Sequence, residues 1–521
     1  GDDHGEDAGS SSPELPESFS EPIPFYGDVL GTYEYPISSM NEEAQAYFNQ
    51  GFRLMYAFAK EDAVRSFRES WKRDPDCAIC YWGEAWAWGS YLNGPMRPFE
   101  APHAYAALQE AVHRNDNANE KERAFIKAMT SRYVEEFDPE TRREQDQAYA
   151  DAMRIVAEAY PNDLDAVTLY GDALFLLEPR RGTRDLNDPN VQRLHGVLES
   201  VLAKDIAHPG ACHLYIHATE STVEPDKAEQ CAEHLGNAIP GASHINHMPS
   251  HTYNQVGRWG DGVRANQRAW HSDQAAAYGE GFAIYTSHNL HMLLFAASND
   301  GQGAVAIQAG ADYTNATGGA QYYEVLTRVR FGRFDDILAM ESDGTQNPIF
   351  KGFWDFGQGY AHLRAGHVDV ARGFLEEIEE GRGSAREGAQ FRGHSASDLL
   401  GIVWGILDGE IAREEGRTDE AIAAFERAVE IEDGLRYDEP EPLNFSVRDW
   451  LGAILLEAAR PAEAEAVYRA GVDDHPFNGW SLFGLEQALR AQGKVGEAEE
   501  IAKIFETSWA RSDVWIRSSR F

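Results

Sequence analysis

The chain has 521 residues, 43% of them hydrophobic and 25% charged, which suits several soluble domains or one long repeat array. Its net charge of −40 repels phosphate backbones, so nucleic acid is not expected as a partner. No apolar run approaches the roughly 18 residues that a membrane-spanning helix needs.

Residues 1–38 are predicted to form an acidic, Ser/Pro-rich tether. Such a tail often follows a cleaved export signal or a lipidated cysteine. We therefore expect a periplasmic or cell-surface protein, with a lipid anchor as one form of that location.

The first repeat is predicted in residues 47–75. Small residues at Gly51 and Ala63 let two helices approach closely, Phe67 fills the space between them, and Pro75 ends the second helix. One such hairpin cannot bury its own apolar face, so hairpins stack on one another. The pattern predicts an all-α, tetratricopeptide-repeat-like superhelical solenoid of antiparallel helix pairs.

Cys77 and Cys80 form a CAIC sequence that lacks the final histidine of a haem-attachment motif. No second pair with this spacing exists to complete a zinc site. We interpret these two residues, together with Cys212 and Cys231, as small buried side chains.

The repeat pattern recurs along the chain and divides it into three folded parts. Residues 39–205 are predicted to hold N-terminal repeats with inserts, one of them at 89–103. Residues 206–310 are the histidine-rich repeats, and residues 311–521 hold regular C-terminal repeats with a capping helix.

Histidines concentrate between residues 213 and 291, which contain nine of the chain's 18. Seven of these nine form three tight groups: His213 with His217; His244 with His247 and His251; and His288 with His291. Spacings of three and four place side chains on one helix face, and two imidazoles at i and i+4 can share one metal ion.

The repeat register indicates where these groups point. Counting back from the helix-ending prolines puts the first two groups on the groove side of successive first helices. Two registers of the repeat fit the helix that carries His288 and His291. One of them places these two histidines in the groove, and the other places them in the core. Pro249 is expected to kink or begin a helix, which would re-aim His247 against His251.

These seven histidines are predicted to build one mono- or dinuclear transition-metal site, with copper or zinc favoured and iron as an alternative. Glu220, three residues after His217, is the candidate carboxylate ligand or catalytic base. A groove that binds a peptide or small molecule without metal, and histidines that serve only packing, are the two alternatives. The acidic turn at Asp438, Glu439 and Glu441 is interpreted as solvated, with metal or substrate contact as its alternative.

The chain resembles a widespread family of bacterial tetratricopeptide-repeat proteins. The likeness rests on PGACHLYIHATE, HMPSHTY and the HNLH run, and on DPDCAICYWGEAWAWG and the closing LGAILLEAARPAEAEAVYR and HPFNGWSLFGLEQALRAQGK. It covers nearly the whole chain after residue 40. The resemblance implies the helical-repeat fold and says little about chemistry.

Two functions therefore compete at this stage. In the first, the protein is a metal-dependent enzyme that activates water or dioxygen for a ligand in the groove. The 89–103 insert would shield that site, and Tyr81, Trp82, Trp86 and Trp88 would wall it. In the second, the array is a protein–protein interaction or assembly scaffold without catalysis, which also admits a homo-oligomer.

Overall fold

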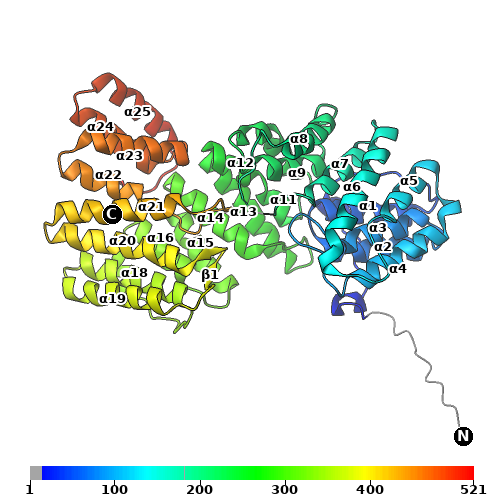
Figure 1. Cartoon of the computed structure of the whole chain (residues 1–521), viewed down its shortest axis with the longest axis horizontal. Helices are drawn as coiled ribbons and strands as arrows, with labels where there is room; N and C mark the ends of the chain where they lie inside the picture. The colour runs from blue at the N-terminus through cyan, green and yellow to red at the C-terminus, as the bar shows by residue number, and fades with distance from the viewer. Residues whose placement is uncertain (1–13, 181) are drawn as a thin grey trace, which may run out of the picture.

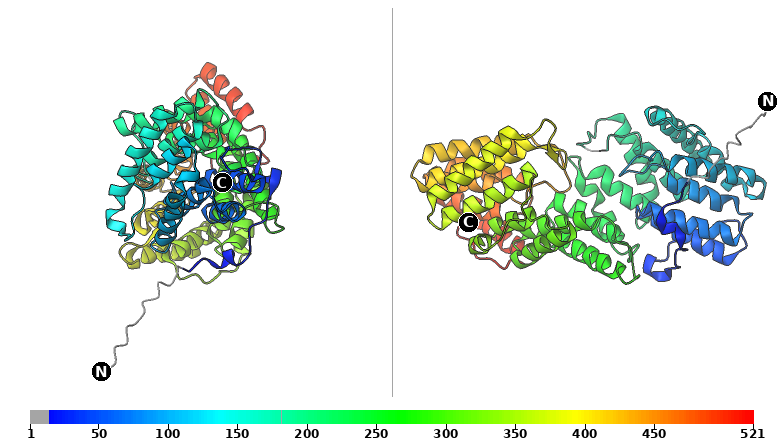
Figure 2. Two further views of the ribbon diagram at one scale, coloured as in Figure 1. Left: turned by 90° about the vertical axis from the view of Figure 1, so that its right-hand side faces the viewer. Right: turned by 90° about the horizontal axis from the view of Figure 1, so that it is seen from below.

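The computed structural model describes residues 14–180 and 182–521, and it is an all-α solenoid of antiparallel helix pairs (Figure 1). This confirms the predicted fold class. The N-terminal and C-terminal repeats lie at opposite ends of an elongated body, with the histidine-rich helices between them (Figure 2). No helix among the described residues is both long enough and apolar enough to cross a membrane.

The N-terminal repeats contain eight helices in the described chain: α1 (Glu42–Tyr56), α2 (Lys60–Arg73), α3 (Ala78–Trp88), α4 (Ala101–His113), α5 (Glu120–Met129), α6 (Arg142–Ala159), α7 (Leu164–Phe175) and α8 (Pro189–Leu202). The central helices are α9 (Pro209–Thr219), α10 (Glu229–Leu235), α11 (Ser243–His247), α12 (Pro249–Val256), α13 (Trp259–Ala276), α14 (Thr286–Asp300) and α15 (Gly303–Ala316). Short 3-10 turns occur at Glu17–Ser20, Gly27–Leu30, Asn115–Asn117, Pro139–Thr141 and Pro225–Ala228.

The C-terminal repeats follow as α16 (Tyr322–Arg330), α17 (Phe334–Leu338), α18 (Pro348–Arg364), α19 (Val368–Ser384), α20 (Ala396–Glu414), α21 (Thr418–Asp433), α22 (Arg448–Glu457), α23 (Pro461–Asp474), α24 (Gly479–Ala491) and α25 (Val495–Ser508). A two-residue antiparallel pair, β1 (Gln390–Phe391) and β2 (His394–Ser395), precedes α20. After α25, residues 509–521 return along earlier repeats, where Asp513 accepts hydrogen bonds from the backbone amides of Gly303 and Ala304 at the start of α15. The chain end is therefore a returning strap beyond the capping helix.

Glycine–aromatic contacts set the spacing of the helix pairs. A Cβ atom on Gly51 would lie 2.7 Å from the ring of Phe67, and one on Gly83 in the next repeat would also collide with that ring. The Phe67 side chain is fully buried between the helices that carry these glycines. The predicted roles of Gly51 and Phe67 are thus confirmed.

Two apolar cores run along the solenoid. One extends from Ile23 to Phe282 and the other from Trp259 to Trp509, so they meet within residues 259–282. The histidine-rich helices lie at this junction. The predicted boundaries at residues 205 and 310 stay a prediction.

The N-terminal segment differs from the predicted tether. Residues 1–13 lie outside the described residues, but the remainder packs on the solenoid. Ile23 and Leu30 are buried, and the Tyr35 hydroxyl donates a hydrogen bond to Asp163 at 2.8 Å. The apolar and aromatic side chains after residue 22 supply contacts that a free tether lacks.

The cysteines also differ in part from expectation. Cys77 and Cys80 are buried as predicted, but they form a disulfide at the start of α3. Cys212 and Cys231 are buried free thiols, as predicted.

Asp172 on α7 provides a test of the N-terminal packing. Burial raises its pKa to about 6 although the nearby Arg132 acts to lower it. Because the raised value favours the neutral acid in the folded state, its stabilising contribution is present below about pH 4 and is lost as the pH rises through about 6. We expect Asp172→Asn to raise the free energy of unfolding by up to about 3 kcal/mol at neutral pH and to leave it nearly unchanged near pH 4.

Chemical denaturation at these two pH values measures this difference. Asp151→Asn, on the exposed face of α6, is the matched control and should show no such dependence on pH. Equal effects of Asp172→Asn at both pH values would contradict the prediction.

Candidate metal centre

Four central helices bring six of the seven predicted histidines together. α9 carries two, α11 carries two, and α12 and α14 carry one each. Pro249 begins α12, as expected, and only Met248, which has helical backbone angles, separates α12 from α11. His213, His217, His244, His247 and His251 are each at most 5% exposed.

The first triad consists of His213, His217 and His244. The Nε2 atoms of His213 and His244 lie 3.1 Å apart, and Nε2 of His217 is buried without a hydrogen-bond partner. One ligand atom from each residue lies within 4.8 Å of the other two. Three imidazole nitrogens thus converge on one point.

The second triad consists of His247, His251 and His288. The Nε2 atoms of His247 and His251 lie 2.8 Å apart, and the ring of His288 is centred 4.7 Å from that of His247. The ligand atoms again lie within 4.8 Å of one another. Both triads therefore have the number and type of ligands found in three-histidine metal sites.

The two triads are neighbours. Ring centroids are 5.4 Å apart for His244 and His247 and 5.6 Å apart for His217 and His251, and each of these pairs has one member in each triad. The sequence grouping placed His244 with His247 and His251, whereas the structure assigns His244 to the first triad.

The outward-facing ring nitrogens are held by hydrogen bonds. Nδ1 of His213 donates to the backbone carbonyl of Tyr56 at 2.6 Å, and Nδ1 of His247 lies 3.0 Å from Oδ1 of Asn266. A donor at Nδ1 leaves the Nε2 lone pair free, which is how proteins orient metal-binding histidines.

Glu220 connects the triads. Its Oε2 atom lies 3.0 Å from Nδ1 of His217 and its Oε1 atom lies 3.1 Å from Nδ1 of His251. The Tyr437 hydroxyl also donates to Oε1 at 2.6 Å. Both carboxylate oxygens are therefore occupied in orienting one histidine of each triad, which does not fit the predicted role of Glu220 as a free catalytic base.

Burial controls the charge of the cluster. It lowers the pKa of His213, His244, His247 and His288 well below the usual value, so these imidazoles are neutral. Burial also acts to lower the pKa of His251, but Glu220 and Glu439 outweigh it and raise that pKa to about 10. The four neutral imidazoles offer lone pairs to a cation, whereas His251 must lose a proton before it can bind one.

His291 does not belong to the cluster. Its ring stacks on Tyr323 with centroids 4.2 Å apart, and it joins none of the potential ligand groups in the described part of the chain. Side chains three residues apart on a helix point in directions that differ by about 60°. His291 therefore points toward Tyr323 of α16, whereas His288 points toward the second triad. The structure therefore does not place His291 in either triad, and of the two registers considered for this residue it has the one that buries the side chain in the core.

The acidic turn at 436–442 reaches the cluster from the C-terminal repeats, although the side chains of Glu439 and Glu441 keep part of their surface in solvent. Glu439 lies 3.2 Å from Nδ1 of His251, and together with His217, Glu220 and His251 it forms a third potential ligand group. Asp438 is held by Arg392 and by His394 at 3.1 Å. The alternative interpretation, metal or substrate contact, is therefore the one that the geometry supports for Glu439.

Aromatic residues enclose the first triad, but not those predicted. Phe58 lies on His213 with centroids 4.0 Å apart, and Tyr285 packs edge-on against His244 at 5.2 Å. The Tyr285 hydroxyl is 2.6 Å from that of Tyr91, so the 89–103 insert does cover this side. The four residues predicted to wall the site pack instead within the N-terminal repeats. Tyr81 stacks on Trp71, Trp86 contacts Phe52 and Trp82, and Trp88 stacks on His103.

Comparisons with known proteins are limited to fold. No protein-family model matches the chain, and no curated protein matches it. Among solved structures, the chain is similar to one in the APC/C hetero-tetramer Cut9–Hcn1, with 12% identity over 92% of this chain and 76% of that one and a TM-score of 0.29. It is also similar to the human IFIT1 dimer with m7Gppp-AAAA (11% identity, 90% of each chain, TM-score 0.30) and to yeast Tom70 (11% identity, 89% of this chain and 90% of that one, TM-score 0.26). Scores this low carry no argument about function.

Proposed function

We propose that the protein holds a dinuclear transition-metal centre, with one metal ion on each histidine triad. The observation that carries the proposal is the proximity of buried Nε2 atoms, 3.1 and 2.8 Å apart within the two triads, while Nδ1 of His213, His247 and His251 is held by an outer partner. In this proposal a metal ion takes the place of the proton that otherwise joins each of these pairs of nitrogens.

Three imidazoles per metal leave a coordination position open, which is typical of catalytic and not of structural sites. All-imidazole ligation suits copper or zinc, with iron as the further candidate. Such a metal supplies Lewis acidity toward water or, if it is redox-active, reactivity toward dioxygen. Glu220 positions His217 and His251 in this proposal, and the enclosing Phe58 and Tyr285 limit access of bulk water.

The scaffold alternative makes a different use of the same fold. Helical-repeat arrays commonly bind peptides in their groove, but five of the six histidines here are buried, which leaves little imidazole surface for a peptide. A protein or oligomer partner would use other surfaces. We keep an exported location as part of the proposal, since the Cys77–Cys80 disulfide suits an oxidising compartment.

Elemental analysis of tag-free protein tests the proposal. Protein from cells grown with copper, zinc and iron should contain two equivalents of transition metal. His244→Ala and His288→Ala should each lose about one equivalent, because each removes a ligand from a different triad. His271→Ala, on the exposed face of α13, should retain both.

A metal content below about a tenth of an equivalent in the wild-type protein would refute the centre. Loss of both metals in His271→Ala would show that the variants act through folding and not through ligation. Circular dichroism of each variant provides the fold control.

A further inference from the structure

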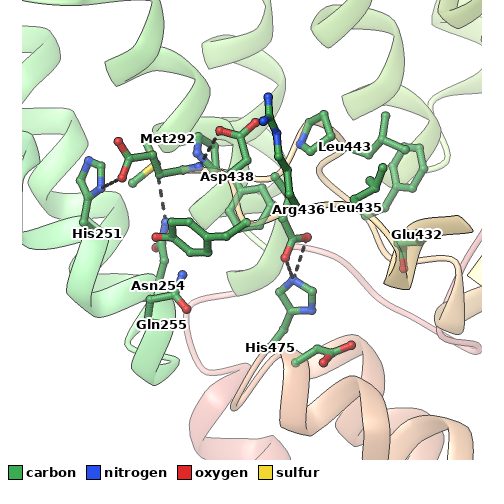
Figure 3. A pocket seen from close by; sticks show the side chains of 18 of the residues that line it. His251, Asn254, Gln255, Met292, Glu432, Leu435, Arg436, Asp438, Leu443 and His475 are labelled. Carbon is green, nitrogen blue, oxygen red and sulfur yellow. Dashed lines mark hydrogen bonds and ion pairs between the residues drawn. The ribbon is translucent and has the colours of Figure 1, made fainter. Parts of the chain in front are cut away.

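A cavity of about 230 Å³ lies beside the second triad (Figure 3). His251 and Asn254 of α12 stand on one side, and His475 and Glu432 stand on the other, near the ends of α23 and α21. The acidic turn at 436–442 lines the cavity between them. Its volume is just below the range of roughly 300–1,000 Å³ that is usual for small-molecule sites, so it suits a compact ligand.

Much of the cavity wall is apolar and aromatic. Trp259, Phe295 and Phe445 present ring surfaces, and Met292 and Leu443 complete this part of the lining. Aromatic faces carry a negative quadrupole and attract cations as well as apolar groups. The lining thus accepts a hydrocarbon portion without excluding a positive charge.

The polar part of the lining is mainly acidic. Asp433 and Asp474 both pair with Arg448, and Glu441 accepts hydrogen bonds from Nε2 of His475 at 2.9 and 3.0 Å. Glu432 forms no ion pair within residues 14–180 and 182–521, although it accepts hydrogen bonds from Ser446 and Val447. Burial, with Glu441 next in effect, raises the pKa of Glu432 to about 8. A ligand cation would provide the missing partner.

Asn254 adds a second polar group without a partner. It is 7% exposed, and its Oδ1 atom has no hydrogen-bond partner in the described structure. Figure 3 shows its side chain at the cavity wall below Met292. Its Oδ1 atom faces Gly262 of α13, so Asn254 shapes this wall of the cavity and does not contact a ligand cation held on the other side.

We propose that this cavity binds a compact organic cation, such as an arylalkyl- or alkylammonium ion. The ammonium group lies by Glu432 and Glu441, and the hydrocarbon portion lies on Trp259 and Phe295. The far end of the ligand points to His251 and thus to the second triad. The assignment of this cation as the substrate class rests on the proposed metal centre, whereas its binding does not.

Isothermal titration with a matched pair of probes tests the proposal. Benzylammonium and the neutral benzyl alcohol have nearly the same shape, so their difference reports the charge. We expect benzylammonium to bind with 1:1 stoichiometry and at least about tenfold more tightly than benzyl alcohol, since one desolvated ion pair is worth about 1.4 kcal/mol or more. This ratio should persist at moderate salt, because the cavity shields the pair, whereas loose attraction to the acidic surface is screened.

Two variants locate the binding. Glu432→Gln keeps the shape of the side chain but cannot ionise to pair with the bound cation, so it should weaken the binding of benzylammonium at least about fivefold, with little change for benzyl alcohol. Glu430→Gln makes the same substitution on the exposed face of α21 and should leave both affinities unaltered. Equal affinity for both probes, no binding of either, or equal losses in the two variants would each overturn the proposal.

The same titration on chelator-treated protein separates this inference from the proposed function. Selective binding of benzylammonium by a protein that elemental analysis shows to be metal-free as purified would keep the cation site and refute the metal centre. Metal content without selective binding of the cation would keep the metal centre and overturn the cation site.

Discussion

Alanine at Glu220 is expected to weaken the binding of both metal ions, by about 10–100-fold each. This range is typical for the loss of a carboxylate that orients a metal-bound histidine. A single side chain acts on both metals because its two oxygens hold Nδ1 of His217 in one triad and Nδ1 of His251 in the other. Without these contacts, His217 loses the hydrogen bond that directs Nε2 inward, and His251 keeps only its contact with Glu439 at 3.2 Å.

Competition of the two metal sites with a chromophoric chelator measures this effect. Asn266→Ala should weaken only one metal, because Asn266 contacts only His247 of the second triad. The metal affinities of Glu220→Gln should lie between those of the wild-type protein and Glu220→Ala. An amide can accept a hydrogen bond from one histidine but presents a donor to the other. The visible spectrum of cobalt-substituted protein should change in parallel, which a purely structural role would not cause.

Glu224→Ala is the surface control. This carboxylate lies in the turn just after Glu220 and pairs only with exposed Lys227, so both metal affinities should be unchanged. An unchanged metal affinity in Glu220→Ala, or the loss of one metal alone, would contradict the proposed bridging position.

Leucine at Arg330 is expected to lower the free energy of unfolding of the C-terminal repeats by about 3–5 kcal/mol. The Arg330 guanidinium pairs with Asp449 at 2.8 Å, donates to the carbonyl of Ser519 at 2.6 Å, and lies 3.5 Å above the ring of Trp480. Both partners of the ion pair are almost fully buried. Removal of Arg330 leaves the Asp449 charge uncompensated and releases the returning strap at Ser519.

Urea denaturation followed by tryptophan fluorescence measures this loss. Arg333→Leu is the matched control, because its ion pair with Asp336 is exposed and should contribute no more than about 1 kcal/mol. The double variant Arg330→Leu/Asp449→Leu should recover part of the loss, since it removes both buried charges. Equal effects of the two arginine substitutions would contradict the account.

Local sequence periodicity determined the helix pairs and the pairs of histidines that share a helix face. The spacing of Gly51, Ala63 and Phe67 required two close helices, because only a small residue admits the Phe67 ring between them. His213 with His217 and His247 with His251 each follow the i, i+4 spacing, and each pair stays within one triad. These features depend only on neighbours along the chain, which is why the sequence by itself was sufficient for them.

The superhelix decided which histidines belong to the same triad. His244 and His247 are three residues apart, yet they belong to different triads, and His288 joins the second from α14. Adjacent positions on a helix separate when each meets a different neighbouring helix, and the contacts between helices depend on the packing of the whole array. His291 turned to Tyr323 for the same reason.

The acidic turn depended on tertiary structure even more strongly. Tyr437 and Glu220 are 217 residues apart in the chain, and their hydrogen bond exists only because the C-terminal repeats curve back toward the central helices. In the sequence, Asp438, Glu439 and Pro440 have the composition of a solvated loop. Composition and spacing therefore determined the type of fold and the imidazole ligands, whereas the curvature of the solenoid decided their partition into two triads and brought Glu439 to them.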